Sequence, residues 1–218
     1  MHLRIITILA LLVALAPAAF AETEASTALP SEHHALAQIT ASAGYQRLPG
    51  EIHAGNLELG ARVLFGHRVA YCVGIDAAAG ASSEGALYRA EALLTGVGLR
   101  FGDAGLIALC AGAGVGGASD VIPTALQLPV ELRLLTQLGS LRLTAHVTAR
   151  FIPLDDARNT GDPIDELDAT LAIGMGSQQA YWRGASAGSG PYVAVTYRHL
   201  LSEDVFGLAV GVELLGAN

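Results

Sequence analysis

The chain has 218 residues and a formal net charge of −8, from 12 basic and 20 acidic side chains. Apolar residues make up 52 % and charged residues 15 %, whereas soluble domains carry about 25 % charged residues. These figures exclude a disordered chain, a basic nucleic-acid-binding protein and a small disulfide-rich domain, and they leave too few charges for an ordinary soluble surface.

The first 21 residues have the layout of a secretory signal peptide. Arg4 supplies the positive n-region, residues 5–16 form an apolar run, and residues 19–21 read Ala-Phe-Ala, which is a small-residue cleavage site. An uncleaved anchor is the alternative, but the run is shorter than the ~20 residues that a spanning helix needs. We therefore expect an exported chain in which residues 22–37 form an N-terminal linker.

Apolar and polar residues alternate strictly in residues 141–151, where the even positions are Arg, Thr, His, Thr and Arg. A period of two predicts a β-strand with two unlike faces. Similar segments, the first of them weaker, occupy residues 38–48, 57–66, 69–78, 87–101, 105–116, 126–138, 141–151, 167–177, 191–200 and 204–215. Because bacterial barrels have an even number of strands, this count favours ten strands over eight.

One face of these strands is nearly free of charge, and the other carries Gly, Ala, Thr and a few charged residues. The first face suits lipid, and the second suits a narrow interior in which small residues leave room for long side chains. An open sheet cannot stand in hydrocarbon, so the strands must close. We predict an all-β, closed antiparallel up-and-down transmembrane β-barrel over residues 38–215, with a C-terminal tail at 216–218. The alternative is a soluble periplasmic β-barrel that binds an apolar ligand.

The chain resembles small bacterial outer-membrane β-barrel proteins, such as the transmembrane domain of outer-membrane protein A. The resemblance rests on the signal peptide, the ten-residue segments, the tight turns at 102–104 and 139–140, the inner face with Arg and Glu, and residues 197–204. The resemblance implies a barrel in contact with outer-membrane lipid, with the N-terminus in the periplasm. Long outer loops are then expected at residues 49–56, 79–86, 117–123 and 153–166.

The polar face collects charged residues that we expect to line the lumen. These are Glu58, Arg62, Arg100, Glu131, Arg133, Arg142, His146, Arg150, Asp168, Arg198 and Glu213. Buried charges need partners, so we interpret the chain as a non-enzymatic outer-membrane barrel with a structural, surface or narrow-pore role and a lumen largely plugged by ion pairs.

Two details of this lumen follow from the pattern. A two-residue turn at 139–140 would place Arg133 opposite His146 and Glu131 opposite Thr148, with Arg150 diagonal to Glu131. Free space is expected beside the Gly-rich strands 105–116 and 204–215.

A barrel enzyme acting on lipid is a weaker hypothesis, based on His199, Ser202 and Glu203. Residues three apart on a strand point to opposite faces, so this spacing is wrong for a catalytic triad unless a turn corrects it. The acidic stretch 155–168 could hold a divalent cation weakly, although a solvated loop is the simpler interpretation. No cofactor and no nucleic-acid partner are expected, and the pattern sets no oligomeric state.

Cys72 and Cys110 are the only cysteines, and both lie on the inner face of their segments. An oxidising compartment would allow a disulfide between them. Their strands are two apart, about 10 Å in a flat sheet, whereas a disulfide needs Cα atoms within about 7 Å. Unless curvature of the barrel closes this gap, the two residues are small inner-face side chains.

Overall fold

The computed structural model describes residues 35–48, 52–66, 69–83, 85–101, 105–118, 122–138, 141–153, 166–175, 188–200 and 203–217. Ten strands cover them: β1 (Ala35–Leu48), β2 (Ile52–Gly66), β3 (Val69–Ser82), β4 (Gly85–Phe101), β5 (Gly105–Ala118), β6 (Ile122–Leu138), β7 (Leu141–Phe151), β8 (Glu166–Met175), β9 (Gly188–Leu200) and β10 (Glu203–Ala217). The expected signal peptide lies outside these residues. Within them, no helix is long and apolar enough to cross a membrane.

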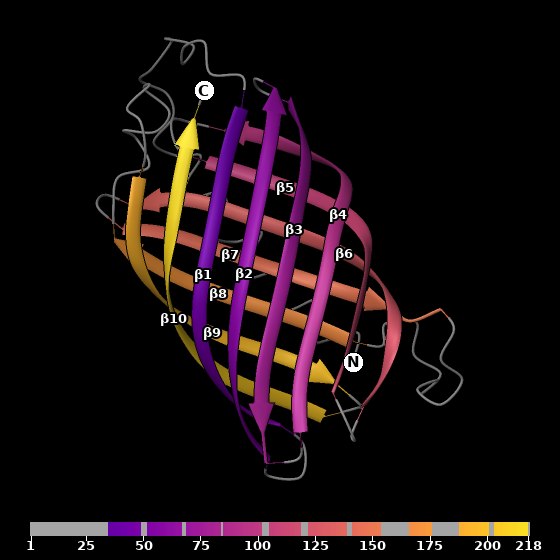
Figure 1. The fold of residues 1–218 in the computed structure, drawn as a ribbon. Coiled ribbons are helices and arrows are strands. Elements are labelled where there is room, and N and C mark those ends of the chain that lie inside the picture. The colour runs from indigo at the N-terminus through magenta and orange to yellow at the C-terminus, as the bar shows by residue number, and fades with distance from the viewer. Residues whose placement is uncertain are drawn as a thin grey trace.

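The ten strands form a single closed barrel (Figure 1). Each strand pairs antiparallel with its neighbours in the chain, and β1 pairs with β10, so no strand edge is left open. The prediction of a ten-stranded up-and-down barrel is confirmed. The barrel runs from residue 35 to residue 217, so it also takes in residues 35–37 and 216–217, which we had assigned to the linker and the tail.

The two ends of the barrel differ in their connections. At the terminal end, where β1 begins and β10 ends, the connection between β8 and β9 spans residues 176–187. At the far end, the strand bounds leave 49–51, 83–84 and 119–121 as short connections and 152–165 as a long one. The expected long outer loops at 49–56, 79–86 and 117–123 are therefore wrong, because the strands continue past the point where the alternation fades.

The outward face is apolar along its whole length. Leu59, Ile75 and Val193 are each at least 60 % exposed, as are Leu57, Leu94 and Val210. Aromatic side chains follow the two rims of this face. Tyr45, Tyr88, Tyr197 and Phe206 lie towards the far end, and Phe65 and Tyr71 lie towards the terminal end. This is the aromatic-girdled band of a transmembrane barrel.

The height of the band can be estimated from the register. Tyr45 pairs with Gly55 on β2, and Phe65 lies ten residues further along the same strand. At ~3.4 Å per residue the two girdles are about 34 Å apart along the strand. A tilt of about 40° reduces this to about 25 Å along the barrel axis, which is the height of a lipid-facing band.

A β-bulge on β4 changes which side chains face inward. The ladder with β5 shifts register between Leu93 and Thr95. As a result Leu93 is 2 % exposed and Leu94 is 63 % exposed. Leu93 therefore faces inward, although the alternation within residues 87–101 puts it on the same face as Val97 and Leu99. A bulge adds one residue to a strand, so the residues of β4 that precede it point to the opposite face from the one that the alternation after it predicts.

Candidate functional site

A layer of buried apolar side chains lies inside the barrel towards the terminal end. Its members are almost inaccessible and come from β1 to β6 and from β10: Leu36, Leu64, Ala70, Cys72, Leu93, Leu106, Ala108, Cys110, Leu135 and Leu215. Each lies on the inner face of its strand, and most lie near the terminal end. These side chains fill the interior on their side of the barrel, as in small barrels.

A disulfide joins Cys72 on β3 to Cys110 on β5 within this layer. The Cα atoms are 6.2 Å apart, closer than a flat sheet would allow, because the barrel wall curves and β4, the strand between the two cysteines, carries a bulge. Gly96 on the intervening strand pairs with Cys110. A Cβ atom at Gly96 would lie 2.9 Å from the sulfur of Cys110, so glycine is what lets the bridge pass over β4.

The first of two ion-pair networks lies next to the apolar layer and centres on Glu131. Arg62 donates from Nε and Nη2 to the two carboxylate oxygens of Glu131 at 3.1 and 2.8 Å. Arg133 donates to the same two oxygens at 3.0 Å each. Both arginines bind the carboxylate in the bidentate fashion that gives the strongest ion pairs. Arg62 also pairs with Asp76 on β3, so the contacts join β2, β3 and β6 across the lumen.

The terminal-end network continues through Gln38 to a second carboxylate. Arg133 Nη1 donates to Gln38 Oε1 at 3.3 Å, and Gln38 Nε2 donates to Glu213 on β10. Arg142 on β7 completes the chain through an ion pair between its Nε and Glu213. The contacts of this network therefore join β1, β2, β3, β6, β7 and β10.

The far-end network centres on Asp168. This carboxylate accepts hydrogen bonds from Arg150 Nη1 at 2.6 Å, Arg198 Nε at 2.7 Å and Arg89 Nη1 at 3.0 Å. Arg150 also donates from Nε and Nη2 to the two oxygens of Glu91, at 2.6 and 3.1 Å. A buried carboxylate surrounded by three guanidinium groups stays charged and fixes all three in place.

The predicted pairing of β6 and β7 is confirmed, with Arg133 opposite His146 and Glu131 opposite Thr148. Arg150 does lie diagonal to Glu131 in the β6–β7 ladder, as predicted, but the two side chains form no ion pair. The ion-pair partners of Arg150 are Glu91 and Asp168, because long side chains reach across the lumen to other strands.

The structure also places the remaining predicted residues. Glu58 lies beside Arg89 at 3.8 Å, and His146 lines the space between the two networks. Arg100 lies on the inner face of β4 and pairs with Leu106 in the ladder. Sequence reasoning missed Arg89 and Glu91, because the β4 bulge reverses their parity.

Two further carboxylates were missed for other reasons. Glu166 was assigned to the acidic loop, yet it begins β8, points inward and lies 3.4 Å from Arg198 Nε. Asp76 is absent from the predicted lumen charges, yet it pairs with Arg62 across the β2–β3 ladder. Among the inner-face side chains that the structure describes, seven arginines balance seven carboxylates: Arg62, Arg89, Arg100, Arg133, Arg142, Arg150 and Arg198 against Glu58, Asp76, Glu91, Glu131, Glu166, Asp168 and Glu213.

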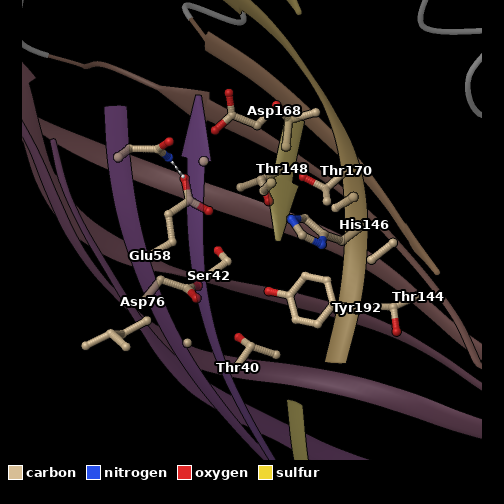
Figure 2. A pocket seen from close by; sticks show the side chains of 18 of the residues that line it. Thr40, Ser42, Glu58, Asp76, Thr144, His146, Thr148, Asp168, Thr170 and Tyr192 are labelled. Atoms are coloured by element: carbon tan, nitrogen blue, oxygen red, sulfur yellow. Dashed lines mark hydrogen bonds between the residues drawn. The ribbon is translucent and has the colours of Figure 1, made fainter. Parts of the chain in front are cut away.

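A cavity of about 1150 Å³, part of it open to solvent, lies between the networks. Figure 2 shows that Glu58, Asp76 and Ser42 line one side and His146, Thr144 and Tyr192 the other. Hydroxyl groups are frequent in the lining: Thr40, Ser42, Thr144, Thr148, Thr170, Tyr192 and Thr196. The cavity touches β10, as expected. It touches no described residue of β5, because the glycines there lie against the backbone of β4.

The structure describes only some of the surface residues considered for catalysis and metal binding. His199 Nδ1 lies 2.8 Å from Asp204 Oδ1, which also accepts a hydrogen bond from Tyr197 at 2.8 Å. Ser202 and the side chain of Glu203 lie outside the described residues. In the acidic stretch 155–168, Glu166 and Asp168 pair with arginines, and residues 155–165 lie outside the described residues. Where side chains are described, no cluster of three or more His, Cys, Asp or Glu could hold a metal ion.

No family model matches the sequence, and no curated protein matches it. Solved structures with similar folds include the NanC porin (8 % identity, TM-score 0.47, 80 % of this chain and 98 % of that chain). They also include the β domain of the Bordetella autotransporter BrkA (8 %, 0.44, 83 % and 98 %) and the translocator domain of autotransporter NalP from Neisseria meningitidis (13 %, 0.38, 90 % and 92 %). At these identities the likeness concerns the barrel fold alone.

Proposed function

We propose that this protein is a non-enzymatic barrel of the bacterial outer membrane, with a lumen that is closed to conduction and a structural or surface-binding role. The observation that carries the proposal is the pairing of an apolar, aromatic-girdled outer face with a charge-balanced inner face. A soluble barrel hides its apolar face, whereas this one presents Leu59, Val193 and Phe206 outward at 60 % exposure or more.

Two features of the terminal end support a closed lumen. The apolar layer and the disulfide fill the terminal end on the side of β1 to β6. On the side of β7 to β9, Arg142 occupies the same level and is 1 % exposed. The polar cavity is therefore blind at one end, which favours holding a solute over passing it through.

Fractionation of the producing cells tests the placement. We expect the protein in the outer-membrane fraction after a high-salt wash, because about 25 Å of apolar wall holds it there rather than surface charge. Release with the periplasmic fraction would favour the soluble alternative.

The closed lumen is tested with the same purified protein in planar bilayers, where we expect no stepwise conductance. The control is a well-conducting porin in the same membrane, which shows that the bilayer detects channels. A deletion of residues 36–64 would destroy the barrel and cannot serve as a control. Large, stable channels from this protein would refute the closed lumen while leaving the membrane placement intact.

A further inference from the structure

One arginine in the lumen lacks partners for most of its donors. Arg142 uses Nε to pair with Glu213, but Nη1 and Nη2 are buried and have no hydrogen-bond acceptor among the residues that the structure describes. Every other guanidinium described in the two networks binds a carboxylate through a terminal nitrogen. An unpaired guanidinium edge in a buried site is costly, and a carboxylate satisfies it best because its two oxygens match the spacing of the donors.

Gly174 makes room for the unpaired Nη1 and Nη2 groups of Arg142. Arg142 pairs in the ladder with Gly174 on β8, which in turn pairs with Tyr192 on β9. A Cβ atom at Gly174 would lie 2.7 Å from Nη2. The guanidinium therefore lies where a side chain at position 174 would stand, and Arg142, Thr144, Gly174 and Tyr192 all line the cavity.

The opposite wall of the cavity has the complementary chemistry. Glu58 has the most exposed side chain among the ion-paired carboxylates of the lumen, at 37 %. Its nearest arginine nitrogen is 3.8 Å away on Arg89, and Asn56 donates one hydrogen bond to it at 2.9 Å. Asp76, on the same wall, is 25 % exposed. Carboxylates that remain this accessible attract a cationic or hydrogen-bond-donating group.

We propose that the cavity is a binding site for a small zwitterionic solute, such as a free amino acid or short peptide, with its carboxylate at Arg142 and its ammonium group at Glu58. The seven arginines and seven carboxylates of the lumen cancel, so a ligand without net charge is favoured over an anion or a cation. The hydroxyl-rich lining would hydrogen-bond the peptide groups between the two ends. This site does not depend on which membrane surrounds the barrel.

The experiment uses the purified full barrel in detergent and measures binding by titration calorimetry. The probes are glycine, diglycine and triglycine, which differ in the separation of ammonium and carboxylate. For the tightest of them, we expect the C-terminal amide to bind at least about tenfold more weakly, because the guanidinium edge loses its carboxylate. The N-acetylated form should also bind more weakly, because Glu58 loses its cationic partner.

Two glycine variants separate the site from general effects on the fold. Gly174→Ala should weaken binding about tenfold by crowding Nη2 while leaving the pair between Arg142 and Glu213 in place. Gly55→Ala is the matched control, because a Cβ there meets nothing within 4 Å, and its affinity should equal that of the wild type. Glu58→Gln should weaken the free peptide and leave the N-acetylated form unchanged.

Several results would overturn the proposal. Equal binding of the free, amidated and N-acetylated probes would remove the two-ended recognition. Unchanged affinity in Gly174→Ala would remove Arg142 from the site. Absence of binding by all three probes at about 10 mM would mean that water alone satisfies the guanidinium edge. None of these results would bear on the placement of the barrel in a membrane.

Discussion

Glu131→Gln should lower the free energy of unfolding by about 3–5 kcal/mol, the cost of removing one partner from a buried ion-pair network. Glu131 receives four hydrogen bonds from Arg62 and Arg133, and the side chains of these arginines are 3 % and 9 % exposed. A neutral amide cannot compensate two buried guanidinium groups. Urea unfolding of the barrel in lipid vesicles, followed by the change in gel mobility between folded and unfolded forms, measures the loss.

The matched control for this variant is Glu58→Gln. The same change of group is made on the same inner face, but Glu58 is 37 % exposed and lies 3.8 Å from Arg89. A solvent-exposed pair contributes about 1 kcal/mol or less, so the control should lose little stability. Equal losses in the two variants would contradict the central position of Glu131 in the terminal-end network.

The second large effect concerns the disulfide. Replacing both Cys72 and Cys110 with alanine should lower the free energy of unfolding by about 4 kcal/mol, because the bridge no longer restricts the unfolded chain. The two residues are 38 positions apart, and this separation sets the size of the loop in that estimate. Urea unfolding without reductant measures the difference between wild type and the double variant.

A reductant provides the control for the disulfide. Wild type unfolded and refolded in reductant should approach the stability of the double variant, whereas the double variant should not respond to reductant. Identical stabilities of wild type and double variant without reductant would show that the bridge does not form in the folded barrel.

The alternation of apolar and polar residues was sufficient to predict the barrel and most of its inward-facing residues. It works because the side-chain period of a strand is two and because lipid and lumen demand unlike chemistry. It fails at β4, where one extra residue near Leu93 reverses the parity and hides Arg89 and Glu91. A bulge leaves no clear mark in one sequence.

The partners of the lumen charges could not be predicted from the sequence. Register gives the neighbours on adjacent strands, such as Arg133 and His146, but Arg62 reaches Glu131 across the lumen from β2 to β6. The disulfide was left open for a related reason. The spacing of strands in a flat sheet overestimates the distance between Cys72 and Cys110 once the wall curves around Gly96.

The most direct test of the membrane-spanning barrel compares two leucines that differ only in depth. Leu59 lies midway between the aromatic girdles, and Leu208 pairs with Tyr45 at the far-end girdle. Their exposures are 61 % and 66 %. In lipid vesicles, Leu59→Arg should lower the free energy of unfolding by about 2–4 kcal/mol and Leu208→Arg by about 0–1 kcal/mol, because the cost of a charge falls with distance from the bilayer midplane. Equal, small losses at both positions would mean that water rather than lipid surrounds the barrel, and they would contradict the account.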